Sequence, residues 1–186
     1  MKKLPAIILL LTLAFTSFAQ LQDQLQDTRR TVFWLKLNLA YVRDPQIKAY
    51  KYETRLINDR IYVGNLEEFQ QQVWKGRAAG NFIVEGPFSF REQAELAKRV
   101  FSPKATKDTS ILNDTKTYYW YLVRLGRYQR LNSYKFEHIP AAVAEGTLKE
   151  FLATLETAKY NSSIVIGPFQ TRVEAELSKR MFRQEE

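Results

Sequence analysis

The chain of 186 residues contains no cysteine and a single histidine, His138. Without a thiol it cannot form a disulfide, an iron–sulfur cluster, a thiolate zinc site or a cysteine nucleophile, and it cannot carry a lipid on an N-terminal cysteine. A lone histidine has no second histidine with which to hold a metal, so we expect no metal and no cofactor. The folded state must then be stabilised by burial of apolar side chains.

The sequence also lacks the short motifs of common catalytic sites. It contains no G-x-S-x-G, no H-E-x-x-H, no P-loop and no G-x-G-x-x-G. Its carboxylates are scattered singly beside basic residues, so no pair stands out for glycoside hydrolysis. We therefore predict a protein that is not an enzyme and has no catalytic residue.

Long apolar runs are absent except near the N-terminus. Lys2 and Lys3 precede the apolar stretch 6–15, and Ser17-Phe18-Ala19 is a small-x-small exit, a pattern typical of a signal peptide over 1–19. The alternative is a membrane anchor, for which about 20 apolar residues are usual. We expect an exported, soluble periplasmic protein that is not a lipoprotein and has no membrane span after cleavage. Export argues against nucleic acid as the partner, although the net charge is +8.

The chain contains an internal repeat. Residues 86–101, GPFSFREQAELAKRVF, align without gaps on residues 167–182, GPFQTRVEAELSKRMF, and 10 of 16 positions are identical. Weaker matches precede them, such as Trp34 with Trp120 and Leu66-Glu67-Glu68-Phe69 with Leu148-Lys149-Glu150-Phe151. We predict two copies of one module, at 29–102 and 116–183, joined by a polar linker at 103–115 and preceded by a polar lead-in at 20–28.

Each copy has the same predicted order of elements, β-β-α-β-α. The first strand, at 31–42, alternates an apolar core face with a second face that carries Trp34. A second strand is expected at 49–56, with a continuation at 60–63, and a buried strand at 82–85. The helices are predicted from capping boxes. In the first copy these are Asn65-x-x-Glu68, with the helix closing at Gly76, and Ser89-x-x-Glu92; in the second they are Thr147-x-x-Glu150 and Thr171-x-x-Glu174.

A module of about 70 residues without disulfides or metal is only marginally stable by itself. We therefore expect the two modules to pack against each other. The predicted fold class is α+β, with the helices of each module on one face of an antiparallel or mixed sheet.

The segments IVEGPFSFREQAELAKRVF and IVIGPFQTRVEAELSKRMF resemble the end of SPOR domains, which are periplasmic peptidoglycan-binding modules. In that family a strand ends in Gly-Pro-Phe, and an Arg and a Glu-Ala helix follow. The run 123–128, VRLGRY, is similar to the family's first-strand Val-Gln-Leu-Gly-x-Phe, with Arg124 in place of Gln. The resemblance implies two ferredoxin-like modules that bind glycan strands. The chain departs from the family's β-α-β-β-α-β order, because 43–56 and 127–140 predict a turn and a strand instead of the first helix.

A candidate glycan site lies on the face of the first strand opposite its apolar side. An indole beside a cation and an amide suits a sugar, whose apolar face stacks on the ring while its hydroxyls bond to the polar neighbours. The alternative is that both tryptophans belong to the core. The candidate ligand-binding residues are Trp34, Lys36, Asn38, Trp120, Arg124 and Tyr128.

Two functions follow from these observations. The first is a non-catalytic peptidoglycan-binding protein in which two weak modules act together. The second is a diverged tandem that has lost the glycan site and serves as an accessory subunit of an envelope complex, such as a secretion, motility or division machine. The missing first helix and the replacement of the family's Gln favour the second.

Overall fold

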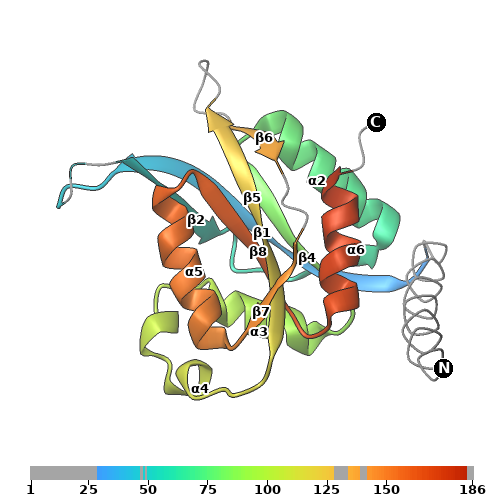
Figure 1. The fold of residues 1–186 in the computed structure, drawn as a ribbon. Coiled ribbons are helices and arrows are strands. Elements are labelled where there is room, and N and C mark those ends of the chain that lie inside the picture. Colours follow the sequence, from blue (N-terminus) through green and yellow to red (C-terminus); the bar gives the residue numbers. More distant parts are fainter. Residues whose placement is uncertain (1–28, 47, 49, 128–133, 139–141, 184–186) are drawn as a thin grey trace, which may run out of the picture.

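The computed structural model describes residues 29–46, 48, 50–127, 134–138 and 142–183. The predicted signal peptide and lead-in therefore lie outside the described residues. The predicted α+β class is confirmed, because antiparallel sheets and helices make up the described chain (Figure 1). Within that part of the chain, no helix has the length and apolar character needed to cross a membrane.

The described chain has two halves with the same order of elements. The N-terminal half contains β1 (Thr31–Arg43), β2 (Tyr50–Leu56), β3 (Tyr62–Asn65), α2 (Leu66–Ala79), β4 (Phe82–Phe88) and α3 (Arg91–Val100). The C-terminal half contains β5 (Tyr118–Arg127), β6 (Tyr134–His138), β7 (Ala144–Gly146), α5 (Leu148–Tyr160), β8 (Ser163–Phe169) and α6 (Arg172–Arg183). Each half thus has one short strand, β3 or β7, beyond the predicted five elements.

Each half builds its own antiparallel sheet around its first strand. β2 pairs with residues 37–43 of β1, and β3 pairs with residues 31–34. β4 pairs with residues 33–38 of the same strand, which places it along the opposite edge. β5 is flanked in the same way by β6, β7 and β8. The extra strand arises because the predicted second strand is interrupted and resumes further along the same edge.

The helices cover both faces of each sheet, so the prediction of helices on one face is wrong. Adjacent residues of a strand point to opposite faces. Trp120 of β5 contacts Phe151 of α5, with ring centroids 5.5 Å apart, whereas the next residue, Tyr121, contacts Phe182 of α6. α5 and α6 therefore cover opposite faces of the second sheet, and both faces are apolar.

The helix starts follow most of the predicted capping boxes. The backbone N–H of Glu68 donates to Asn65 Oδ1 at 2.9 Å, and the equivalent bonds form in α5 and α6. The predicted Ser89 cap is wrong. α3 begins one residue later, and the N–H of Phe90 donates to Gln93 Oε1 at 3.0 Å.

Gly76 does not end α2 as predicted. The helix continues to Ala79 and ends at Gly80, whose φ of 66° suits a glycine. A Cβ at Gly76 would lie 2.8 Å from the carbonyl oxygen of Phe82, so this glycine instead permits the close approach of α2 and β4.

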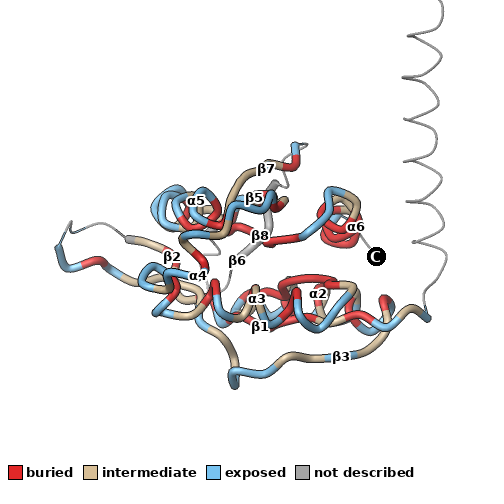
Figure 2. Tube along the Cα trace, turned by 90° about the horizontal axis from the view of Figure 1, so that it is seen from below, coloured by how far each residue is buried: buried red, intermediate tan, exposed pale blue. Residues whose placement is uncertain are grey.

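The two halves pack against each other through equivalent positions of the repeat. The rings of Phe88 and its equivalent Phe169 lie 5.5 Å apart. Gln93 Nε2 donates to Oε1 of its equivalent, Glu174, at 3.1 Å. Contacts between equivalent residues are typical of an approximate two-fold arrangement. In Figure 2, α5, β5, β8 and α6 of the second half lie above β1, α2 and α3 of the first half.

The segment predicted as a linker is folded. It contains the 3₁₀ turn η1 (Ala105–Lys107) and the short helix α4 (Thr109–Leu112). Ala105 and Ile111 are buried, and Asp108 accepts a hydrogen bond from the N–H of Ser110 at the start of α4. The connection is therefore part of the packed structure.

Candidate functional site

The two tryptophans of the candidate glycan site lie in the core. Trp34 and Trp120 are each 4% exposed. Trp34 packs on Phe69 of α2, and Trp120 packs on Phe151 of α5. The expectation of an open aromatic face is wrong for both indoles. α2 covers the face of β1 that carries Trp34, and α5 covers the face of β5 that carries Trp120.

Lys36 lies beneath α2, the helix that also covers Trp34. Its Nζ donates to Gln72 Oε1 at 2.8 Å and lies 4.8 Å from the ring centroid of Tyr62. Desolvation by burial, and then the nearby charge of Lys75, lower the pKa of this ammonium below its ordinary value. The amine is therefore already occupied by groups of its own half.

The remaining candidate residues do not assemble into one site. Asn38 and Arg124 are exposed, but Asn38 belongs to the first sheet and Arg124 to the second. Tyr128 lies outside the described residues. The structure thus brings no indole, cation and amide together on one open face in the part of the chain that it describes.

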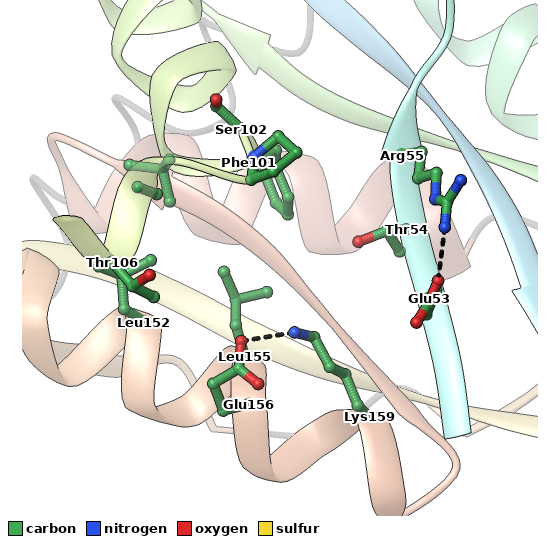
Figure 3. A pocket seen from close by; sticks show the side chains of 13 residues that line it. Glu53, Thr54, Arg55, Phe101, Ser102, Thr106, Leu152, Leu155, Glu156 and Lys159 are labelled. Atoms are coloured by element: carbon green, nitrogen blue, oxygen red, sulfur yellow. Dashed lines mark hydrogen bonds and ion pairs between the residues drawn. The ribbon is translucent and has the colours of Figure 1, made fainter. Parts of the chain in front are cut away.

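A groove that the sequence did not predict lies between β2 and α5, and we refer to it as the β2–α5 groove. Its volume is about 420 Å³. Its walls come from both halves, since β2 belongs to the first and α5 to the second, while the turn after α3 closes a third side (Figure 3). It is lined by Glu53, Thr54, Arg55, Val100, Phe101, Ser102, Pro103, Ala105, Thr106, Leu152, Leu155, Glu156 and Lys159.

The groove combines an apolar floor with a charged rim. Phe101 and Leu152 are buried, and Leu155 is half-buried. Figure 3 shows Thr54 and Leu155 pointing into the space from its opposite walls. At the rim, Arg55 pairs with Glu53 at 3.0 Å, and Lys159 pairs with Glu156. Each charged side chain of the rim is thus paired with an oppositely charged side chain on the same wall of the groove.

The groove narrows toward the start of β2. There a much smaller space, about 10 Å³, is left between Tyr52 and Ala158. Beyond it, Asp44 Oδ2 accepts a hydrogen bond from the hydroxyl of Tyr160 at 3.1 Å and pairs with Lys51 at 2.9 Å. The hydrogen bond to Asp44 raises the pKa of both Lys51 and Tyr160. These polar contacts hold the end of α5 on the β1–β2 hairpin.

A buried polar cluster lies at the contact between the halves, and its residues do not line the groove. Glu85 is 0% exposed, and its Oε2 accepts from the N–H of Gly167 at 2.9 Å. Its Oε1 has no hydrogen-bond partner among the described residues. Desolvation by burial raises the pKa of this carboxyl well above its ordinary value, against the opposing effect of the Gly167 bond. Burial therefore favours the protonated, uncharged form of this carboxyl.

The cluster continues through a hydroxyl pair. The hydroxyl of Tyr121 lies 2.9 Å from Ser178 Oγ, and Ser178 Oγ donates to the carbonyl oxygen of Gly86. Burial also raises the pKa of Tyr121 well above its ordinary value. A perturbed carboxyl can mark a catalytic site, but these groups are enclosed between the halves and bond to each other. Their arrangement joins β4, β5, β8 and α6.

Comparison with known proteins yields no relative. No family model, no curated protein and no solved structure matches the chain. Within the described ranges, histidine and acidic side chains form no group of three that could hold a metal.

Sequence reasoning missed the groove because its walls come from different halves. The edge strand and the helix were each predicted, but their distance depends on how the halves pack. No local motif reports that packing.

Proposed function

We propose that this protein is a non-catalytic interaction protein of the bacterial envelope, an accessory subunit that binds a partner protein in the β2–α5 groove. The observation that carries the proposal is the groove itself, a concave surface with an apolar floor and a charged rim, built where the two halves meet.

The chemistry of the groove supports binding rather than catalysis. Its charged residues form ion pairs along the rim, and its floor is formed by aliphatic and aromatic side chains. An apolar centre inside a polar rim is the usual anatomy of a protein interface. The predicted signal peptide and the resemblance to periplasmic modules support an envelope location.

Peptidoglycan binding, which the resemblance implies, needs aromatic faces that a sugar can reach. Because Trp34 and Trp120 are both buried, the structure favours a protein partner over a glycan strand. Sedimentation with purified sacculi at low and moderate salt tests this choice. We expect no pelleting at moderate salt, since attraction of a basic protein to acidic peptide stems is screened there.

Site-specific photo-crosslinking in the native organism tests the protein partner. A benzoylphenylalanine replaces Thr106, an exposed residue of the groove, or Gln71, an exposed residue of α2 that does not line it. We expect a discrete protein adduct from position 106 and none from position 71. Ser102→Trp, which places a large ring in the groove, should remove the adduct.

The opposite pattern would contradict the proposal. An adduct that forms equally from both positions, or one that persists in Ser102→Trp, would place the partner elsewhere. No adduct from position 106 together with pelleting of sacculi at moderate salt would support the glycan function instead.

A further inference from the structure

The edge of β2 that faces the groove carries main-chain groups without a partner. In the part of the chain that the structure describes, β2 pairs only with β1. The N–H of Ile57 donates to the carbonyl oxygen of Lys36 at 2.8 Å, which identifies this pair as a hydrogen-bonded one. In an antiparallel ladder such pairs alternate with pairs whose N–H and C=O groups point away from the partner strand.

This alternation determines which groups of β2 point outward. The register places Leu37 opposite Leu56 and Leu39 opposite Thr54. The pair of Ile57 with Lys36 is hydrogen-bonded, so the next pair, at Leu56, is not, and neither is the pair at Thr54, two residues further on. The main-chain groups of Thr54 and Leu56 therefore point away from β1. Thr54 lines the groove. Its outward N–H and C=O make no hydrogen bond within the described residues.

An unpaired strand edge beside an apolar helix is a known form of peptide site. An extended segment can pair with the free edge, while pockets on the facing helix take alternate side chains. Here β2 supplies the edge, and Leu152 and Leu155 of α5 supply the apolar wall. Free edges of this kind otherwise promote aggregation, and proteins usually cover them.

The rim and the shape of the groove restrict the occupant further. Glu53 and Arg55 neutralise each other, as do Glu156 and Lys159, so the lining carries no net charge. The narrowing between Tyr52 and Ala158 leaves no room for a further strand there. The space for an added segment therefore lies beside Thr54 and toward Leu56.

Resting on the proposed function, we propose that the occupant is a short, uncharged, extended segment of the partner protein that adds a strand to β2 at Thr54 and Leu56 and places an apolar side chain against Leu152 and Leu155. The main-chain bonds hold the segment, and the apolar floor selects which side chain it presents.

Two variants at one position separate strand pairing from mere groove filling. Thr54→Pro removes the outward N–H but no bond of the β1–β2 ladder, and proline is tolerated on edge strands in this orientation. Thr54→Val keeps the N–H and the branched shape. Circular dichroism and urea unfolding check that both variants fold like the parent protein.

The probe is a phage-displayed library of random 12-residue peptides, selected on the full mature chain and rebuilt as synthetic peptides. We expect Thr54→Pro to weaken a selected peptide by about tenfold or more, since a lost hydrogen bond and a steric clash add together. Thr54→Val should change the Kd by less than about threefold. Methylation of single peptide nitrogens should weaken binding at every second position, the period of a paired strand.

The outcomes distinguish this inference from the proposed function. If Ser102→Trp blocks the peptides but Thr54→Pro binds them like the parent protein, or nitrogen methylation shows no period of two, strand addition is overturned and the groove remains the binding site. A library without binders also overturns strand addition. If peptides bind and Ser102→Trp has no effect, while position 106 gives no adduct in cells, the proposed function itself fails.

Discussion

The two halves share the order of their elements, yet they differ in the chemistry that they bring to their common interface. Residues of the second half stand 81 positions after their equivalents in the Gly-Pro-Phe segment and 86 after them in the first strand. The differing pairs are Glu85 and Ile166, Ala97 and Ser178, and Leu35 and Tyr121. Each pair joins one polar with one apolar side chain.

The polar members of these pairs meet on one side of the approximate two-fold. Ser178 reaches the carbonyl oxygen of Gly86, while its equivalent Ala97 has no group with which to reach Gly167. The N–H of Gly167 donates to Glu85 Oε2, whereas Ile166, the equivalent of Glu85, has no polar side chain to offer Gly86. Two similar backbones can therefore pack with near symmetry while their side chains make the contact directional.

The same comparison explains where the groove opens. Arg77 Nη1 donates to the carbonyl oxygen of Phe182 at 3.2 Å, which joins the end of α2 to the end of α6. Its equivalent, Lys159, pairs with Glu156 on its own helix and lines the groove. α3 also ends at Val100, whereas α6 continues to Arg183. The ends of α5 and α3 thus leave the space of the groove between them, whereas a hydrogen bond joins the ends of α2 and α6.

The largest expected effect on stability concerns the buried tryptophan that occupies the equivalent position in each half. Trp34→Ala and Trp120→Ala should each lower the free energy of unfolding by about 3–5 kcal/mol, because each removes a large buried side chain and leaves a cavity. Urea denaturation measures both. If either variant lowered the free energy of unfolding by less than about 1 kcal/mol, that indole would be exposed and the glycan hypothesis would be supported.

A smaller effect concerns Glu85, where the halves differ. Because the pKa of the buried carboxyl is raised, the folded chain keeps a proton that the unfolded chain loses above the ordinary pKa of 4.5. The free energy of unfolding should therefore fall as the pH rises from that value toward the raised pKa. Glu85→Gln should abolish this slope and stabilise the protein at neutral pH by about 1–3 kcal/mol.

Glu92→Gln is the matched control for this prediction. Glu92 is exposed on the neighbouring helix α3, so its substitution should leave the slope unchanged. Urea titrations from pH 4 to 8 compare the three proteins. A wild-type slope that Glu85→Gln leaves intact would assign the pH dependence to another group.

The smallest effect concerns the hydroxyl pair. Ser178→Ala, which copies Ala97, should cost about 1–2 kcal/mol because it leaves the buried Tyr121 hydroxyl without its partner. Tyr121→Phe should then cost less in the Ser178→Ala background than in the wild type. A double-mutant cycle measures the coupling, which we expect at about 1 kcal/mol. Additive losses would show that the two hydroxyls do not stabilise each other.

Local sequence predicted the parts of the fold that depend on neighbours along the chain. The alternation in 31–42 and the caps at Asn65, Thr147 and Thr171 need only residues a few positions apart, and all appear in the structure. The Ser89 cap failed because two overlapping four-residue patterns compete there. Gln93 reaches the N–H of Phe90, so the helix starts one residue later.

The candidate site failed for a reason of a different kind. The alternating pattern distinguishes the two faces of β1, but it does not tell which of them a later helix covers. Trp34 is buried because Phe69, 35 residues further on, packs over it. The groove likewise depends on the distance between β2 and α5, which belong to different halves. Contacts so distant in sequence leave no pattern in a short window.

The contacts of Phe88 with Phe169 and of Gln93 with Glu174 are those that two identical subunits would make in a symmetric dimer. Here one chain supplies both partners, so the association is intramolecular. The stability of the whole should therefore not change with dilution, whereas two separately made halves would associate only as mass action allows.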